Sequence, residues 1–170
     1  MRSHFIFAVL AVALLAAAPA RAKDSGQKFK TVEPKHFDRA EGVELSADFN
    51  DYLYAELRNQ LQKTKLFAQV IGEGEVVDDA DAPASVVVSG TLTEYKKGSV
   101  AKAVLIGYGA GSRSLKAQVN VIRRSDQKNL ATLEVHVRAS PRWTEKVLAQ
   151  EAARELAKQI KNSLQHESAS

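Results

Sequence analysis

The sequence predicts an α+β domain in which a mixed or antiparallel sheet of about five strands carries two amphipathic helices packed on one face. Three observations lead to this prediction. Two long segments have apolar residues at every fourth position, which is the spacing of a helix with one buried face. Several segments between them alternate apolar and polar residues, as strands do. The order is strand, helix, several strands, helix, with no internal repeat and no interdomain linker.

The first 22 residues have the pattern of a secretory signal peptide. Arg2 gives a positive start, residues 5–18 form an unbroken apolar run, and Ala20 and Ala22 match the small-residue pattern that signal peptidase accepts. The run is too short to span a bilayer comfortably, and no stop-transfer pattern follows it. A cleaved signal is therefore expected, and a retained membrane anchor is the alternative.

This organises the chain into four parts. We expect residues 1–22 to be the signal peptide, residues 23–28 a disordered N-terminus, residues 29–165 a single α+β domain, and residues 166–170 a frayed tail. Removing 22 of the 170 residues leaves 148, which is enough for one domain with its own core.

Composition restricts the class of protein. The whole chain has 24 basic and 20 acidic residues, and the signal holds two of the basic ones, so the mature chain has a net charge of +2. Cysteine is absent, so no disulfide can stabilise the domain and no cysteine can be acylated as in a bacterial lipoprotein. We expect a periplasmic protein of a Gram-negative bacterium, without a lipid anchor and with at most peripheral membrane contact.

The first half of the domain should contain two short strands around a helix. Residues 29–37 include a proline and suit a strand at a sheet edge. A helix is predicted over residues 46–65, with Ser46 as N-cap and an apolar face made by Phe49, Leu53, Leu57 and Leu61. A strand over residues 67–72 should follow. Residues 73–81 hold five acidic residues and no basic one, which indicates a solvated loop rather than a metal site.

The second half should contain a strand, a hairpin and the last helix. Residues 84–95 predict a strand, and two alternating runs, residues 115–121 and 132–137, should form an antiparallel hairpin. Pro141 ends the last strand, and Thr144 can cap the final helix. The apolar face of that helix consists of Leu148, Ala152, Leu156, Ile160 and Leu164.

Residues 104–112 match neither an ordinary strand nor an ordinary helix. Gly107, Gly109 and Gly111 superficially suggest a dinucleotide fingerprint, but that motif needs a helix to open at its last glycine, and a strand pattern follows here. Two interpretations remain. The glycines form a bend or bulge that leads into the strand, or the largely apolar residues 100–110 form an exposed contact surface that includes Tyr108.

The same region is unusually basic. Residues 96–124 contain seven basic residues and no acidic one, so they could face an anionic envelope component. The alternative is a solvated sheet face balanced by the acidic loop at residues 73–81. No nucleic acid is expected, because aromatic residues are not interleaved with the basic ones. The candidate contact surface is Gly107, Tyr108, Gly109, Gly111, Lys96, Lys97, Arg113, Lys116, Arg123 and Arg124.

No catalytic, metal-binding or cofactor-binding residue is predicted. His36, His136 and His166 of the mature chain are each isolated and lack the spacing of metal ligands. Ser112 lacks the flanking glycines of a nucleophile elbow. The alternative is a small hydrolase with a pocket that gathers His36 or His136 with an acidic partner.

Three segments resemble a family of bacterial exported proteins known only as domain of unknown function 4410. They are the strand at residues 86–91, the Gly-Tyr-Gly-Ala-Gly-Ser segment at residues 107–112, and the strand after it, followed by a terminal amphipathic helix. The resemblance covers about residues 29–164 and implies a small α+β domain in the cell envelope, without catalytic residues. Many relatives have Asp-x-x-x-Gly in the hairpin turn, where this chain has Asp126 to Asn129, so the turn type is left open.

These observations predict a non-catalytic exported envelope protein. Its role is expected to be that of a binding or accessory/assembly module for an unknown envelope protein or an anionic envelope component. The alternative is a peripheral membrane or anionic-lipid-binding protein that uses residues 100–124.

Overall fold

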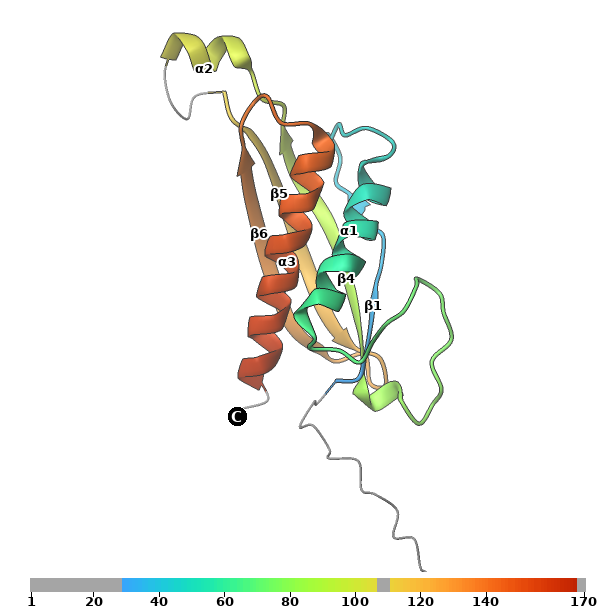
Figure 1. Cartoon of the computed structure of the whole chain (residues 1–170). Helices are drawn as coiled ribbons and strands as arrows, with labels where there is room; N and C mark the ends of the chain where they lie inside the picture. The colour runs from blue at the N-terminus through green and yellow to red at the C-terminus, as the bar shows by residue number, and fades with distance from the viewer. Residues whose placement is uncertain (1–28, 107–110, 168–170) are drawn as a thin grey trace, which may run out of the picture.

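The computed structural model describes residues 29–106 and 111–167. Its elements in chain order are β1 (Thr31–Pro34), β2 (Asp38–Arg39), α1 (Phe49–Thr64), β3 (Gln69–Val70), the 3₁₀ turn η1 (Ala82–Ala84), β4 (Ser85–Lys96), α2 (Val100–Ile106), β5 (Arg113–Arg123), β6 (Asn129–Ala139) and α3 (Glu145–Glu167). The helices α1 and α3 lie side by side on one face of the sheet, whereas α2 projects at one end of the molecule (Figure 1). The predicted α+β class is confirmed.

The sheet is mixed and has six strands, one more than expected. Its order is β3-β1-β4-β5-β6, and β2 pairs with β4 off this path. The strand β1 is parallel to β3 and to β4, whereas β4, β5 and β6 are antiparallel. The expected edge position of the first strand is wrong, because β3 pairs with its outer side. Pro34, which suggested an edge, stands at the last position of β1, where the pairing ends.

The core lies between the sheet and the two long helices. The four apolar residues predicted for α1 are all buried, and so are the five predicted for α3. They pack with the inward side chains of the strands, among them Val86, Val119 and Val135. Cysteine is absent, so burial of this apolar surface carries the stability of the domain.

The start of α1 differs from the expectation. Its N-cap is Asp48 rather than Ser46, and the helix begins at Phe49. The guanidinium of Arg39 donates to the backbone oxygens of Leu45 at 3.0 Å and of Ser46 at 2.8 Å. These bonds fix the segment that precedes the helix, and the first helical residue is Phe49.

The other helix ends follow local signals more closely. Thr144 caps α3 as predicted, with its hydroxyl accepting from the Val147 N–H at 3.4 Å. The helix continues to Glu167, into the residues expected to fray. No helix in the described part of the chain has the length and apolar character needed to cross a bilayer.

Residues 100–106 are helical, which corrects the expectation that residues 104–106 belong to neither an ordinary strand nor an ordinary helix. Ser99 begins this helix: its carbonyl accepts from the Ala103 N–H at 3.1 Å, and its hydroxyl accepts from the Lys102 N–H at 3.4 Å. Of the glycines in the predicted bend, Gly111 has a φ of +79°, which the absence of a Cβ permits. Gly107, Tyr108 and Gly109 lie outside the described residues.

Candidate functional site

The helix α2 presents an apolar surface to solvent. Val104, Leu105 and Ile106 are 72%, 83% and 73% exposed, and Val100 is also exposed. We call these four residues the tip surface. Monomeric proteins rarely leave neighbouring large apolar side chains in water unless they bind something. The tip surface is therefore the strongest candidate for a contact surface among the described residues.

The base of α2 is held against the sheet and the segment before α3. The Ser99 N–H donates to the carbonyl of Gly111 at 2.8 Å, which closes the connection between β4 and β5. Gly98 packs so closely on Pro141 that an added Cβ would lie 2.8 Å from the Pro141 Cα. These contacts anchor the base, while the helix α2 itself projects at the end of the molecule (Figure 1).

The predicted basic residues are divided between paired and exposed positions. Lys96 and Lys116 each lie 2.8 Å from the carboxylate of Glu94. Hydrogen bonds from Lys116 and then from Lys96 lower the pKa of Glu94 to about 2. The carboxylate therefore stays charged at neutral pH and offsets part of the positive charge on this face of the sheet.

Arg123, the last residue of β5, and Arg124, which follows it, also have acidic partners. Arg123 lies 3.1 Å from Asp126 in the hairpin turn, and Arg124 pairs with the buried Glu33 of β1. These partners lie outside the basic stretch of the sequence. The positive charge of residues 113–124 is therefore largely balanced by acidic side chains from other elements, as the solvated-face alternative requires. These acidic side chains are Glu33, Glu94 and Asp126, and they do not come from the loop at residues 73–81.

Cationic groups remain around the tip surface. Lys97 lies between β4 and α2, Lys102 lies on α2, and both are exposed. Arg113 opens β5 beside Tyr95 and Glu145. Burial raises the pKa of Tyr95, and the charge of Arg113 opposes this effect. The structure thus brings Lys96, Lys97 and Arg113 to the end of the sheet that carries α2.

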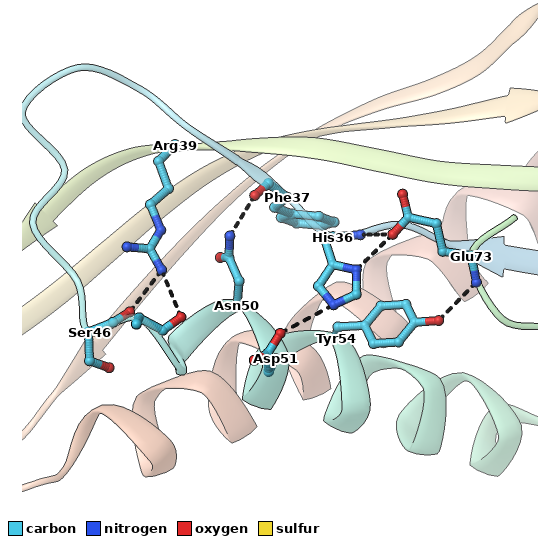
Figure 2. Close-up of polar contacts among 9 residues, drawn as sticks. His36, Phe37, Arg39, Ser46, Asn50, Asp51, Tyr54 and Glu73 are labelled. Atoms are coloured by element: carbon cyan, nitrogen blue, oxygen red, sulfur yellow. Dashed lines mark hydrogen bonds and ion pairs between the residues drawn. The ribbon is translucent and has the colours of Figure 1, made fainter.

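A polar cluster around His36, for which the sequence suggested an acidic partner only in the hydrolase alternative, joins the segment after β1 to α1 and to the acidic loop (Figure 2). The Nδ1 atom of His36 lies 2.7 Å from Oε2 of Glu73, and its Nε2 atom lies 3.5 Å from Oδ1 of Asp51. The His36 ring stacks on Tyr54 with the ring centroids 4.1 Å apart. The Tyr54 hydroxyl accepts from the Glu73 N–H at 2.9 Å. The expectation that His36 is isolated is wrong.

This cluster acts as a clamp on the loop. The backbone N–H of His36 donates to Glu73 at 3.0 Å, and this bond, followed by the side-chain bond from His36, lowers the pKa of Glu73. Within the described residues, the hydrogen-bond and ion-pair partners of the His36 ring are the carboxylates of Glu73 and Asp51. The described residues also contain no group of three or more His, Cys, Asp or Glu able to hold a metal ion.

A second set of polar contacts holds the residues before and after β2 against α1 and α3. The side-chain amide of Asn50 donates to the carbonyl of Phe37 at 2.8 Å (Figure 2). Glu145, at the start of α3, accepts from the Ser46 N–H at 3.0 Å and from the Tyr95 hydroxyl at 3.2 Å. Burial raises the pKa of Glu145, but the bonds from Ser46 and Tyr95 outweigh it, and the pKa is lowered overall.

Comparison with known proteins identifies relatives in sequence and in fold. The family model described as "Domain of unknown function (DUF4410)" matches residues 22–140. No curated protein matches the sequence significantly. The matched range includes residues 107–112, of which residues 107–110 are outside the described part of the chain, and it ends before α3.

Three solved structures share the fold at low identity. Protein XCC0632 from Xanthomonas campestris, of the family DUF330, is 11% identical, with a TM-score of 0.56 over 84% of this chain and 89% of that chain. The PelC dodecamer from Paraburkholderia phytofirmans is 13% identical, with a TM-score of 0.55 over 75% and 85%. The hypothetical protein CT253 from Chlamydia trachomatis is 13% identical, with a TM-score of 0.54 over 79% and 97%. At these identities the similarity shows the fold alone.

Proposed function

The chain belongs to the DUF4410 family, and on that premise we propose that it is a non-catalytic, exported binding or assembly module of the cell envelope. The observation that carries the proposal is the tip surface, where a seven-residue helix leaves Val100, Val104, Leu105 and Ile106 exposed. Binding a partner there would remove this apolar surface from water, which is the main favourable contribution to most protein association.

Export rests on the first 22 residues. Ala20 and Ala22 suit the small-residue positions of a signal peptidase site, so the mature chain should begin at Lys23. Mass spectrometry of the protein from the periplasmic fraction tests this. An intact Met1 in most molecules would contradict export, whereas cleavage after Ala20 would only move the site.

Site-specific crosslinking tests the contact surface. A photoreactive amino acid at Leu105 should give a defined crosslinked protein in intact cells, and the same group at Val76 should not. Val76 is a matched control because it is 94% exposed but lies in the loop at residues 73–81 rather than on α2. Equal crosslinking at both positions would contradict a specific surface on α2.

Self-association is one form that such a module can take. The PelC structure is a dodecamer, and light scattering of the purified protein would show whether this chain also forms a closed oligomer. Changing Leu105 and Ile106 to Ser should return any such oligomer to monomers if the tip surface forms the contact.

A second candidate function, peripheral binding to an anionic membrane, is favoured by the exposed Lys97 and Lys102 beside the tip surface. Apolar side chains flanked by lysines suit the interface of an anionic bilayer. Flotation with phosphatidylglycerol vesicles tests this. Binding should weaken as salt rises through about 0.15 M, where charges are already strongly screened. Absence of binding at low salt would remove this candidate.

A further inference from the structure

The strand β6 forms a long edge of the sheet (Figure 1). It pairs with β5 on one side and with no strand of the described residues on the other. It has 11 residues, whereas β3 at the opposite edge has two. In an antiparallel pair, every second residue points its N–H and C=O away from the partner strand. The outer side of β6 therefore presents a row of main-chain donors and acceptors.

Natural sheets protect such an edge, because its main-chain groups can bind another strand. Proline, a bulge, or a charged side chain that points into the core is the usual protection. Residues 131–139 contain no proline, and the core-facing ones are all apolar. The register shift of the hairpin lies between Asn129 and Ala131, next to the turn. Residues 131–139 thus keep a regular edge that another strand can join.

Charged side chains also protect an edge when they repel an incoming strand, but β6 carries charges of opposite sign. Glu134, His136 and Arg138 occupy alternate positions on the face of the sheet opposite the helices, and all three are exposed. The β5 residues directly opposite Glu134 and Arg138 are the uncharged Gln118 and Ser114. Direct pairing across β5 therefore neutralises neither charge.

Lys116 of β5 is also a neighbour of these charges, but it is engaged elsewhere. Its ammonium lies 2.8 Å from the carboxylate of Glu94 on β4. The hydrogen bond with Glu94 is the main cause of the raised pKa of Lys116, and the charge of Glu134 contributes less. Glu134 and Arg138 therefore keep the capacity to pair with charges on a strand at the outer side of β6.

A second copy of this chain supplies the matching charges. When two β6 strands pair antiparallel about a two-fold axis at His136, Glu134 of each copy lies opposite Arg138 of the other. Both pairs form together because the two charges are two residues before and two residues after His136. The core-facing side also matches, since Val135 then lies opposite Val137, and both are apolar and buried.

Other registers lose this match. An axis at Glu134 or at Arg138 places two like charges opposite each other, which is unfavourable. An axis one residue away from His136, at Val135 or Val137, leaves Arg138 without Glu134 opposite it. An axis between two residues places core-facing side chains of one copy beside solvent-facing side chains of the other. The charge pattern thus selects the axis at His136.

From this match we propose that the edge of β6 is an interface for a second copy of this chain. The two β6 strands pair antiparallel about an axis at His136 and join the two sheets into one. Main-chain hydrogen bonds hold the strands together, and the pairs of Glu134 with Arg138 set their register. This interface goes beyond the proposed function, because it uses the edge of β6 rather than the tip surface.

Sedimentation velocity of the purified protein tests the association, and a dimer is expected at or below about 0.1 mM. Glu134→Arg and Arg138→Glu should each weaken the dimer about tenfold, because each variant places two like-charged pairs in the interface. The double exchange restores both pairs and should return the affinity to within about threefold of the wild type. Glu41→Arg is the matched control: it makes the same change of charge at an exposed position before α1 and should leave the dimer unchanged.

Single cysteines test the register, because the wild-type chain contains none. His136→Cys lies on the axis, so a short bismaleimide should join the two copies. Thr132→Cys is also exposed and on the same face, but about 26 Å separate it from its counterpart in the proposed register, so it should not be joined. Equal crosslinking at the two positions would contradict the register and overturn the proposal.

Two other results would also overturn it. One is a protein that stays monomeric up to about 0.1 mM. The other is a dimer that the single charge reversals do not weaken, or that the double exchange does not restore. Thermal melts establish that each variant is folded, and the two single reversals test the same contacts independently. Changing Leu105 and Ile106 to Ser should leave this dimer intact. A dimer that this change dissociates, and that Glu134→Arg leaves intact, would assign the contact to the tip surface instead.

Discussion

The Nδ1 atom of His36 lies 2.7 Å from Oε2 of Glu73 and joins two segments that are 37 residues apart in the chain. The same oxygen accepts from the backbone N–H of His36, and Tyr54 completes the contact from α1 by stacking on His36 and bonding to the Glu73 N–H. A loop that contains five acidic residues is thereby fastened to the domain at its first residue.

Glu73→Gln should release this loop. The pKa of Glu73 is lowered below its ordinary value of 4.5, so its contribution is fully present above about pH 4.5 and is lost as the pH falls below that value. At pH 7 the variant should be cut faster by subtilisin between residues 73 and 81, because an amide oxygen accepts from the two His36 donors more weakly than a carboxylate does. Asp79→Asn, a change of the same charge in the exposed part of the loop, should leave cleavage unchanged. Equal cleavage of the two variants would contradict the clamp.

Leu57→Ala and Leu156→Ala should each reduce the free energy of unfolding by about 2–5 kcal/mol, because both side chains are fully buried and truncation leaves a cavity. Urea denaturation measures this. Leu105→Ala is the control, and its effect should stay within about 0.5 kcal/mol because the side chain is exposed. Losses below about 1 kcal/mol for both core variants would mean that the helix faces are assigned wrongly.

Arg124→Met should destabilise the domain by about 3 kcal/mol, because it leaves the charge of Glu33 buried without its partner. The double variant Glu33→Gln with Arg124→Met should recover most of this loss, since a neutral amide can still accept from Gly74. Arg123→Met is the matched control: its partner Asp126 is exposed, so the cost should be at most about 1 kcal/mol. Chemical denaturation of the wild type and the three variants measures these differences in the free energy of unfolding. A double variant as unstable as Arg124→Met would argue against an unpaired charge as the cause.

Gly111→Ala should disturb the base of α2. An added Cβ would lie 2.2 Å from the carbonyl oxygen of Ser99, a backbone atom that cannot move aside without breaking the connection. Gly42→Ala separates this clash from backbone strain, because Gly42 also has a positive φ but nothing lies within 4 Å of its added Cβ. Hydrogen exchange of residues 99–103 should accelerate in Gly111→Ala only. Similar exchange in the two variants would show that the close approach is unimportant.

Glu94→Gln should flatten the acid dependence of stability. Hydrogen bonds from Lys116 and Lys96 lower the pKa of Glu94 to about 2, so the wild-type protein loses this contribution as the pH falls from 4.5 toward 2. The variant has no such charge to lose. Thermal melts across this pH range test the difference, which should be small at pH 7 because the pair is exposed. A parallel decline in both proteins would assign the acid sensitivity to other carboxylates.

The local sequence pattern was sufficient to predict those helices and strands whose apolar residues recur with a clear period. The four-residue spacing along α1 and α3 predicted which side chains are buried, and the alternation along β5 and β6 predicted the hairpin, because these periods follow from backbone geometry. The Thr144 cap is equally local. The helix α2 escaped prediction because seven residues show barely two turns, too few for a period, and because the adjoining glycines favoured a bend.

The sequence by itself determined the fold class, the faces of the long helices and the family of the chain. Tertiary structure alone decided which charges meet. Arg124 lies 91 residues from its partner Glu33, and His36 lies 37 residues from its partner Glu73. No pattern of local sequence spacing predicts such pairs, because they depend on the register of the strands. The parallel pairing of β1 with β4 placed Glu33 beside Val87 and within reach of Arg124, and thereby made their ion pair possible. The sequence specifies which charged and polar side chains are present, but which of them become partners depends on contacts that only the folded sheet creates.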